Sequence, residues 1–385
     1  MSFSFFQKIF GFKKRVLGID IGSTTIKVVE LTRDLQGRIL LENYGFLENY
    51  GHLERVNNAF QTSGLKMLEK EVSKILSFLL KKMKVKTKDA VFGVPIYSVL
   101  ATVLEMPMMP KEDLKKAIPY QAKQFVPFPL SETYLDWFLI KPSKEEIKFR
   151  NFNKQLVFLI AYPKDLVLRY QRIAKVCNLN LKILELETLA LREAMIETEE
   201  PIFILDIGSR VTNLVIFDNK FLRVNRFFDL ASGDLTEVIS SGLKVNIWRA
   251  EEFKKRVGLK PSESEREISN LMYPVIDSIL REVSKLINLY LAKTGRRVTK
   301  LILTGGTASM PGFLEYCQTQ FKDLKVRKGN AFLKIFCAFF KGKEKTVLPK
   351  YLKIYSVPSK SSLSLIHISE PTRPLYISYA VFCLK

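Results

Sequence analysis

Histidine is nearly absent from this 385-residue sequence, and cysteine is sparse. The two histidines are His52 and His367, and no two of the four cysteines form a CxxC pair. We therefore do not expect a histidine-based catalytic triad or a histidine-rich zinc site. The wide spacing of the cysteines argues against a zinc ribbon or a thioredoxin-like centre and fits a reducing compartment.

Long apolar runs and the common nucleotide motifs are also missing. No stretch of about 18 uncharged apolar residues occurs, as a bilayer span would need. The N-terminal segment lacks the apolar core and cleavage site of a secretory signal. We therefore expect a cytoplasmic protein. Neither GxxxxGK[ST] nor GxGxxG is present, so P-loop and Rossmann sites are not expected.

Acidic residues are outnumbered by basic ones. The chain has 61 Lys and Arg against 39 Asp and Glu, a formal charge of +22, which favours anionic partners. The lysines are spread along the chain, and no recognisable nucleic-acid-binding motif is present, so we do not expect nucleic acid as a partner. Phenylalanines alternate with basic residues in an arm over 1–13, which predicts weak contact with an anionic membrane surface. The alternative is an arm packed on the first lobe.

An internal repeat is the most informative feature of the sequence. VLGIDIGS at 16–23 is echoed by IFILDIGS at 202–209, with Asp206 standing 186 positions after Asp20. An apolar alternation follows each copy, over 25–29 and 212–217. This pattern predicts a strand, a tight turn and a second strand in each half. We expect two related lobes, the first over 14–200 and the second over 201–358.

A third glycine site and several helices complete the predicted organisation. A buried strand at 301–304 runs into Gly305 and Gly306, and Pro311 suits the first turn of the next helix. Amphipathic patterns predict helices over 65–83 and 271–292. Strands at 90–95, 134–140 and 156–162 and a helix at 111–125 indicate a small α+β subdomain inserted over about 90–160. The alternation elsewhere indicates α/β lobes.

The two Asp-Ile-Gly-Ser turns suggest a site for an anion. Glycine tolerates positive φ, which would let the chain reverse tightly after each strand, and the following amides could form an anion-binding nest. The aspartates Asp20 and Asp206 would hold a hydrated Mg²⁺. One such turn fits an ordinary hairpin, whereas two copies and a Gly-Gly strand end indicate phosphate binding. The candidate residues of the two turns are Gly22, Ser23, Thr24, Thr25, Gly208 and Ser209.

The three glycine sites resemble the phosphate 1, phosphate 2 and adenosine motifs of the actin-like ATPase superfamily. The resemblance implies a two-lobed α/β fold that binds ATP and Mg²⁺ in a cleft. By resemblance, Lys27 would contact the β-phosphate, although a solvent-facing lysine on a strand edge is the alternative.

The remaining nucleotide contacts are also implied by resemblance. Glu251 would meet the ribose and Lys254 would lie near the nucleoside, unless the two form a surface i, i+3 ion pair. Gly305 and Gly306 would let the backbone approach the nucleotide. No general base is evident beyond Asp206, so we expect at most slow hydrolysis.

More specifically, the sequence resembles the type IV pilus assembly protein PilM family. The resemblance runs over about 14–357 and is carried by DIGSTTIKVVEL at 20–31, the insert segment at 105–140 and LELETLALREA at 184–194. It implies an ATP-binding scaffold peripheral to the inner membrane, linked to the pilus motor ATPases. Such a scaffold docks the cytoplasmic N-terminal segment of PilN beside the insert. Phe128, Tyr134 and Trp137 are the predicted partner-binding residues, unless they form the small core of the insert.

Two rival functions are alternatives to the pilus assembly scaffold. A sugar or acetate kinase of the same superfamily needs an acidic base facing an acceptor, and no second acidic cluster is evident. An FtsA-like division protein ends in an amphipathic membrane-targeting helix, and residues 359–385 do not show the hydrophobic periodicity of such a helix.

The tail over 359–385 resembles a translated sequencing-adapter read-through and carries Pro371 and Pro374. We treat it as non-native, with a divergent native tail as the alternative.

Overall fold

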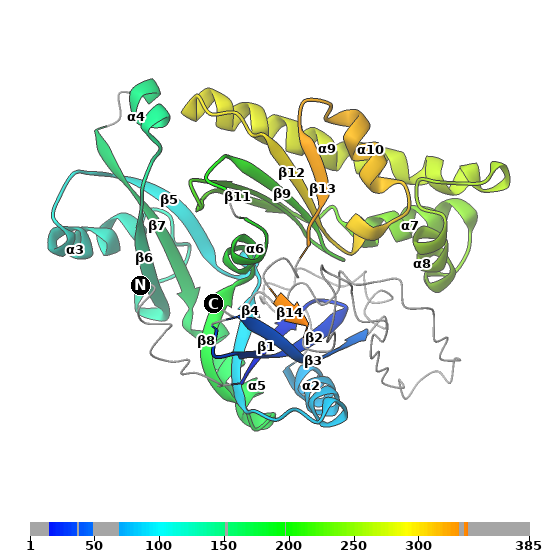
Figure 1. Cartoon of the computed structure of the whole chain (residues 1–385), viewed down its shortest axis with the longest axis horizontal. Helices are drawn as coiled ribbons and strands as arrows, with labels where there is room; N and C mark the ends of the chain where they lie inside the picture. Colours follow the sequence, from blue (N-terminus) through cyan, green and yellow to red (C-terminus); the bar gives the residue numbers. More distant parts are fainter. Residues whose placement is uncertain are drawn as a thin grey trace.

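The computed structural model describes residues 15–36, 38–48, 69–150, 153–196, 198–330 and 335–337. Within these ranges the chain forms two large sheets, each covered by helices, and a smaller third sheet to one side (Figure 1). The predicted N-terminal arm, the tail from residue 359 and the first turn of the helix expected over 65–83 lie outside the described residues. No helix in the described ranges is both long and apolar enough to cross a bilayer.

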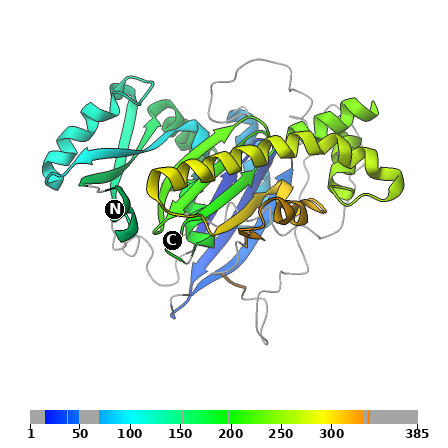
Figure 2. The same ribbon diagram turned by 90° about the horizontal axis from the view of Figure 1, so that it is seen from above.

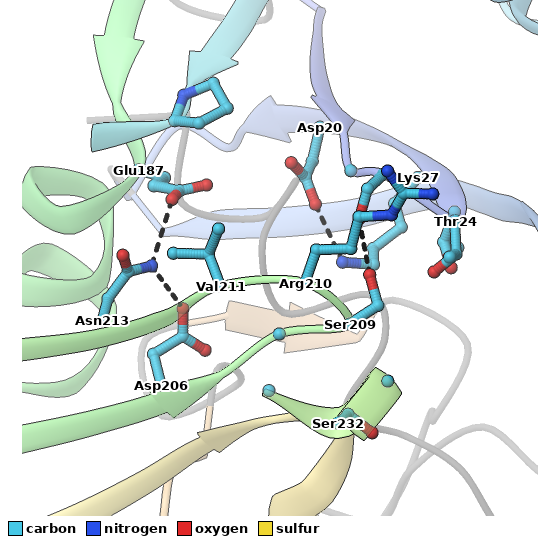
Figure 3. A pocket seen from close by; sticks show the side chains of 18 of the residues that line it. Asp20, Thr24, Lys27, Glu187, Asp206, Ser209, Arg210, Val211, Asn213 and Ser232 are labelled. Carbon is cyan, nitrogen blue, oxygen red and sulfur yellow. Dashed lines mark hydrogen bonds and ion pairs between the residues drawn. The ribbon is translucent and has the colours of Figure 1, made fainter. Parts of the chain in front are cut away.

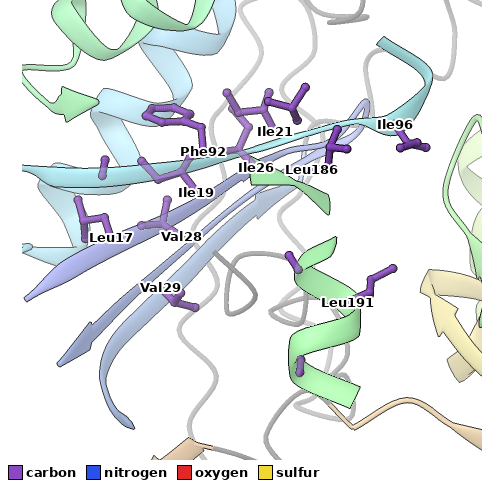
Figure 4. Close-up of a cluster of buried hydrophobic side chains, with 14 of the residues drawn as sticks. Leu17, Ile19, Ile21, Ile26, Val28, Val29, Phe92, Ile96, Leu186 and Leu191 are labelled. Carbon is purple, nitrogen blue, oxygen red and sulfur yellow. The ribbon is translucent and has the colours of Figure 1, made fainter. Parts of the chain in front are cut away.

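The first lobe is built on a six-stranded sheet. Its central strand β1 (Val16–Ile21) is buried at every position and pairs antiparallel with β2 (Thr25–Arg33) and parallel with β4 (Asp89–Val94). The sheet order is β14-β3-β2-β1-β4-β8, completed by β3 (Ile39–Glu48), β8 (Asn180–Leu186) and β14 (Ile335–Cys337). Its core joins β1, β2 and β4 side chains to the helices α2 (Glu69–Met83), α5 (Lys164–Val176) and α6 (Glu187–Met195) (Figure 4).

The second lobe is built on a five-stranded sheet. Its order is β11-β10-β9-β12-β13, formed by β9 (Ile202–Ile207), β10 (Thr212–Asp218), β11 (Phe221–Phe228), β12 (Lys300–Gly305) and β13 (Lys325–Lys328). The long helix α9 (Arg266–Thr294) contains the predicted 271–292 helix and lies across the sheet (Figure 2). An apolar stripe of this helix is buried in the core of the lobe. The other helical segments are α7 (Ser232–Leu243), α8 (Ile247–Arg256), η4 (Glu263–Glu265), η5 (Gly306–Ser309) and α10 (Phe313–Gln320).

The sequence repeat corresponds to a structural repeat. β1, β2 and β3 form an antiparallel meander, and so do β9, β10 and β11. The first strand of each meander also pairs in parallel with a later strand, β4 in one lobe and β12 in the other. The predicted strand–turn–strand units and the two-lobed α/β fold are therefore confirmed.

The insert is a three-stranded antiparallel sheet with its own core. It comprises β5 (Leu100–Pro107), α3 (Lys111–Ala122), η3 (Leu130–Glu132), β6 (Thr133–Ile140), α4 (Lys144–Arg150) and β7 (Lys154–Pro163), in the order β5-β7-β6. Leu114 and Ile118 of α3 pack on Leu104 and Leu159 of the sheet. The strand that we placed at the start of the insert, β4, instead belongs to the six-stranded sheet, because it is buried between β1 and β8. The small sheet therefore starts at β5, after the short helix η2 (Ile96–Ser98).

The prediction for Pro311 was wrong. The helix α10 begins at Phe313, and Gly312 before it has φ 78°. A Cβ at Gly312 would lie 2.7 Å from the carbonyl carbon of Leu259, whose own N–H donates to the Pro311 carbonyl at 2.7 Å. The chain is held in this left-handed turn, so the helix begins only after the glycine.

Candidate functional site

The first turn joins β1 to β2 and brings a buried ion pair to the strand ends. Asp20 and Lys27 are direct cross-strand partners, and Lys27 Nζ lies 2.8 Å from Asp20 Oδ2. The Gly22 N–H closes the hairpin by donating to the Thr25 carbonyl at 2.9 Å. Lys27 is only 6% exposed, so it is not a solvent-facing lysine on a strand edge.

The second turn repeats this geometry with a different chemistry. Asp206 and Asn213 are cross-strand partners, and the Gly208 N–H donates to the Val211 carbonyl at 3.0 Å. Asn213 therefore occupies the position that Lys27 holds in the first turn. Its Nδ2 donates to Asp206 Oδ2 at 3.1 Å and lies 3.4 Å from Glu187 Oε1.

Glycine is required in both turns, although not for the reason that we expected. Neither Gly22 nor Gly208 adopts a positive φ. A Cβ at Gly22 would lie 3.0 Å from the Thr25 carbonyl oxygen, and one at Gly208 would lie 2.9 Å from that of Val211. The close approach of the carbonyl across each hairpin, rather than backbone handedness, therefore favours glycine at both positions.

The two turns meet over a single cavity. Ser23 Oγ and Ser209 Oγ lie 2.5 Å apart, so the turns touch directly. Figure 3 shows Asp20 and Lys27 of the first turn across the cavity from Asp206 and Ser209 of the second. The cavity encloses about 1040 Å³ of space free of protein atoms, part of it open to solvent. The structure brings together in its lining every predicted nucleotide-binding and metal-binding residue: Asp20, Gly22, Ser23, Thr24, Thr25, Lys27, Asp206, Gly208, Ser209, Glu251, Lys254, Gly305 and Gly306.

Gly305 connects the third glycine site to the second turn. It has φ 81°, and a Cβ there would lie 2.2 Å from the Ile207 carbonyl oxygen and 2.9 Å from Asp206 Oδ1. Since β12 pairs in parallel with β9, its last residue lies beside the strand end that carries Asp206. Both the backbone angle and the space therefore require glycine here.

Asp206 lies at the centre of a buried hydrogen-bond network. Its carboxylate accepts from Asn213 and, at 3.0 Å, from the hydroxyl of Thr304. Burial raises the pKa of Asp206 to about 6, although these two hydrogen bonds favour the ionised form. A carboxyl whose pKa lies near neutrality in a cavity is a candidate for proton or cation chemistry.

Sequence reasoning missed Glu187, which also lines the cavity. It is the first residue of α6, directly after β8. Burial, together with the nearby Asp20 and Asp206 carboxylates, raises its pKa well above the ordinary value. Because β1, β4 and β8 run parallel, their carboxyl ends share one sheet edge. The acidic residue directly after β8 could therefore have been predicted to lie at the same sheet edge as Asp20.

Glu251 and Lys254 form a buried cluster rather than a surface pair. Lys254 Nζ lies 2.5 Å from Glu251 Oε2 and donates to the Ser232 and Thr236 hydroxyls at 2.8 and 2.7 Å. Burial raises the pKa of Glu251, but Lys254 and Lys255 outweigh that effect and lower it to about 2. Glu251 therefore presents an ionised carboxylate at the cavity wall.

The residues fit a nucleotide and a hydrated cation. Among the described residues, no three acidic, histidine or cysteine side chains converge closely enough to hold a bare metal ion. Asp20 and Asp206 are the carboxylates on this cavity wall that could hold a Mg²⁺ through its water shell. Asn213 Oδ1 is buried without a hydrogen-bond partner in the described part of the chain, so an acceptor remains available at the cavity wall.

The three predicted partner-binding residues do not lie together. Phe128 and Tyr134 are exposed, at 41% and 51%, whereas Trp137 packs against the core of the insert. Tyr134 and Trp137 lie three residues apart on β6, so their side chains point to opposite faces of the sheet. Trp137 therefore belongs to the small core of the insert, which was the alternative to a partner-binding role.

Comparison with known proteins identifies the fold. The chain is similar to the solved structure titled "PilM-PilN type IV pilus biogenesis complex", with a TM-score of 0.67 and 18% identity, over 83% of this chain and 89% of that one. The ethanolamine utilization protein EutJ from Carboxydothermus hydrogenoformans gives a TM-score of 0.51 and 15% identity, over 83% and 87%. The fold is that of the actin-like ATPases.

The sequence comparisons identify the family. A family model described as type IV pilus assembly protein PilM matches residues 18–336, and the chain belongs to this family. The cell division protein FtsA of Bacillus subtilis (strain 168) is 24% identical over 188 residues, 42% of this chain and 41% of that protein. The chain thus matches about two-fifths of that curated relative. The predicted resemblance to the family is confirmed.

Gly305→Ala should destabilise the protein far more than Gly45→Ala. A left-handed φ costs a residue with a Cβ roughly 1–3 kcal/mol, and the collision with the Ile207 carbonyl adds to that cost. At Gly45, which has no left-handed φ, a Cβ would meet side-chain atoms of Met83 and Leu79, 2.9 and 3.1 Å away, so we expect a loss of about 1 kcal/mol. Urea unfolding of both variants tests this, and equal losses would contradict the strain argument.

The stability of the Asp206→Asn variant, relative to that of the parent protein, should increase as the pH rises. The native pKa of Asp206 is about 6 against an ordinary 3.8, so this carboxyl stabilises the fold below about pH 4 and loses that contribution as the pH rises through 6. Relative to the parent protein, the variant should gain about 3 kcal/mol in unfolding free energy between pH 4 and 7. Urea unfolding without nucleotide or Mg²⁺ measures this, and a pH-independent difference would refute it.

Proposed function

We propose that this chain is an ATP-binding scaffold of type IV pilus assembly that binds ATP with Mg²⁺ between its lobes and docks the cytoplasmic N-terminal segment of PilN. The pilus assembly role follows from the family, whereas nucleotide and partner binding are the proposal. The observation that carries it is the convergence of both repeated turns and the third glycine site on one cavity.

The two turns supply the groups that phosphates need. The residues after Gly22 and Gly208 line the cavity, to which Ser23, Ser209 and Thr24 also contribute hydroxyl-bearing side chains. Backbone amides of this kind hold anions as nests, and glycine leaves them accessible. The Lys27 ammonium, fixed by Asp20, adds a positive charge at the base of the first turn.

The acidic residues of the cavity would serve the metal and a water. Bound Mg²⁺ would neutralise phosphate charge, with Asp20 and Asp206 holding its water shell. Glu187, whose pKa is raised, lies 3.4 Å from the Asn213 amide and joins the predicted Asp206 as a candidate for accepting a proton from water. Asn213 would hold both carboxyl groups in place through its amide.

The Glu251–Lys254 cluster suits the nucleoside. A buried, ionised carboxylate is a strong acceptor for two neighbouring ribose hydroxyls. The Lys254 ammonium is committed to Glu251 and Ser232, so it would orient the acid rather than neutralise a phosphate. Gly305 and Gly306, on the same cavity wall, would admit the nucleotide beside their backbone.

The presence of Glu187 also favours a second candidate function. A small-molecule kinase needs an acidic base in the cleft, and Glu187 supplies an acid that sequence reasoning had not found. A screen for phosphate transfer from ATP to sugars and acetate distinguishes the two functions. We expect no transfer, since the family is one of pilus assembly proteins.

Replacing Asp20 and Asp206 by alanine should weaken ATP binding in the presence of Mg²⁺ at least tenfold, about 1.4 kcal/mol. The loss should shrink when Mg²⁺ is omitted, because both carboxylates act on the metal. Calorimetric titration measures this, with circular dichroism to confirm folding. Glu263→Ala, which removes an acid with a 94% exposed side chain, is the control. Unchanged affinity in the double variant would refute the site.

Phe128→Ala and Tyr134→Ala should each weaken binding of a PilN N-terminal peptide by about tenfold, because exposed aromatics are typical anchors at such interfaces. The matched control is Leu168→Ala, an exposed apolar residue on α5. Fluorescence anisotropy with a labelled peptide measures the affinity. Full affinity in both variants would place the docking surface elsewhere, and ATP binding should be unaffected.

A further inference from the structure

One edge of the first lobe carries a dense cluster of lysines. The helix α2 ends at Met83, and a short segment connects it to β4. Five of the eight residues over 81–88 are lysine, and all five are exposed. We call this cluster the basic edge, defined by Lys81, Lys82, Lys84, Lys86 and Lys88. Such a density of one charge on a surface favours an extended anionic partner.

The fold directs these lysines outward. Exposure alternates over 84–88, where the lysines are exposed and the residues between them are half-buried. Val85 packs against the core of the lobe, and the Thr87 hydroxyl donates to the Arg15 carbonyl at 3.1 Å. The intervening side chains therefore fix the segment to the lobe, while the lysine side chains remain in contact with solvent.

The acids near the basic edge pair with other bases. Glu30, whose side chain is 1% exposed, lies 3.8 Å from Arg15, and Glu42 lies 3.3 Å from the same arginine. Asp89, directly after the basic edge, lies 3.4 Å from Lys182. These three acids are therefore engaged by bases outside the basic edge.

The end of a helix explains only part of the cluster. Lys81 and Lys82 lie in the last turn of α2, where cations offset the partial negative charge of the helix terminus. Lys84, Lys86 and Lys88 follow the last helical residue, and this effect falls off within the last turn. Stabilisation of the helix therefore does not account for the second half of the basic edge.

The basic edge lies opposite the cavity. β1, β4 and β8 run parallel, so their first residues share one edge of the sheet, and Lys88 directly precedes β4. Asp20, Pro95 and Glu187 line the cavity at the other ends of these strands. Figure 1 shows α2 and α5 at the end of the first lobe that points away from the second lobe. A large partner could therefore cover the basic edge and leave the cavity open.

The composition of this edge fits a membrane surface better than a nucleic acid. Residues 81–88 contain neither arginine nor an aromatic residue, the side chains that grip phosphates in a fixed geometry or stack on bases. Lysines on flexible stems suit a diffuse layer of anionic headgroups. By sequence, residues 1–14 carry five phenylalanines and no acid. They lead into Arg15, whose carbonyl contacts the basic edge segment.

We propose that the basic edge is a membrane-binding surface that takes anionic phospholipid headgroups. Bound in this way, the first lobe rests on the bilayer and its nucleotide cavity faces away from it. The surface consists of residues of the folded lobe, in addition to the membrane contact predicted for the N-terminal arm. This inference goes beyond the proposed function and depends on neither nucleotide nor peptide binding.

Removing three of the charges tests the proposal. Lys84→Gln with Lys86→Gln and Lys88→Gln, in the full chain, should bind vesicles of equal parts phosphatidylglycerol and phosphatidylcholine roughly a hundredfold more weakly. The reason is that each lysine near an anionic surface contributes about fivefold to the affinity. Co-sedimentation with the vesicles measures this. Parent-like affinity of the triple variant would overturn the proposal.

The matched control removes the same charge elsewhere. Lys111, Lys115 and Lys116 are exposed on α3 of the insert, so their replacement by glutamine changes the net charge equally. This control should keep the affinity of the parent protein. An equal loss in both triple variants would show that only net charge matters and would overturn the assignment to the basic edge.

Two further measurements identify the occupant. Binding of the parent protein should be lost on vesicles of phosphatidylcholine alone and in about 1 M salt, where the screening length falls to about 3 Å. Retained binding in either condition would contradict an electrostatic contact. Fluorescence anisotropy with a labelled single-stranded oligonucleotide tests the other anion. If the parent binds the oligonucleotide more tightly than the vesicles and the triple variant loses that binding, the basic edge belongs to nucleic acid and the proposal is wrong.

Discussion

The arrangement of this protein depends on the close approach of two hairpin turns, one from each lobe. Their serine hydroxyls lie 2.5 Å apart. Each turn is itself tight, because a Cβ at Gly22 or Gly208 would lie 3.0 or 2.9 Å from a carbonyl oxygen of its own hairpin. The cavity and its acidic lining surround this contact. The meeting of the two turns therefore fixes where the residues of the two lobes face each other.

The two turns share a backbone but have diverged in charge. The first places Lys27 opposite Asp20, which gives an ion pair. The second places Asn213 opposite Asp206, so the amide serves Asp206 and Glu187 together. The common register gives both hairpins the same backbone arrangement, whereas the different side chains give them different chemistry. The first turn presents a cation that Asp20 fixes in place. The second turn presents Asp206, whose pKa burial raises and whose carboxylate shares the Asn213 amide with Glu187 of the first lobe.

The candidate residues of the two turns all line the cavity, because each turn is a local hairpin whose residues stay together in space. The pairing of Asp20 with Lys27 was not predicted, although their seven-residue separation across a hairpin makes them cross-strand partners. Glu187 was missed because its place depends on β8 pairing with β4, a contact between segments about 90 residues apart. Trp137 was misplaced for a related reason. Proximity in sequence suggested an aromatic cluster, but the alternation of a strand sends Tyr134 and Trp137 to opposite faces.

Dependence on tertiary pairing also explains why the start of the insert was predicted incorrectly. β4 resembles the strands of the insert in composition, yet it is buried between β1 and β8, and only tertiary pairing assigns it to the large sheet. The insert that remains has a small apolar core of its own on one face of its sheet. The other face joins the main apolar cluster, in which Leu156 and Phe158 lie with Phe217 and Leu222 of the second lobe. The buried ion pair of Glu146 with Arg223 adds to this contact. The insert is therefore held on the second lobe by apolar burial and by charge together, through contacts between distant segments that no local sequence pattern reveals.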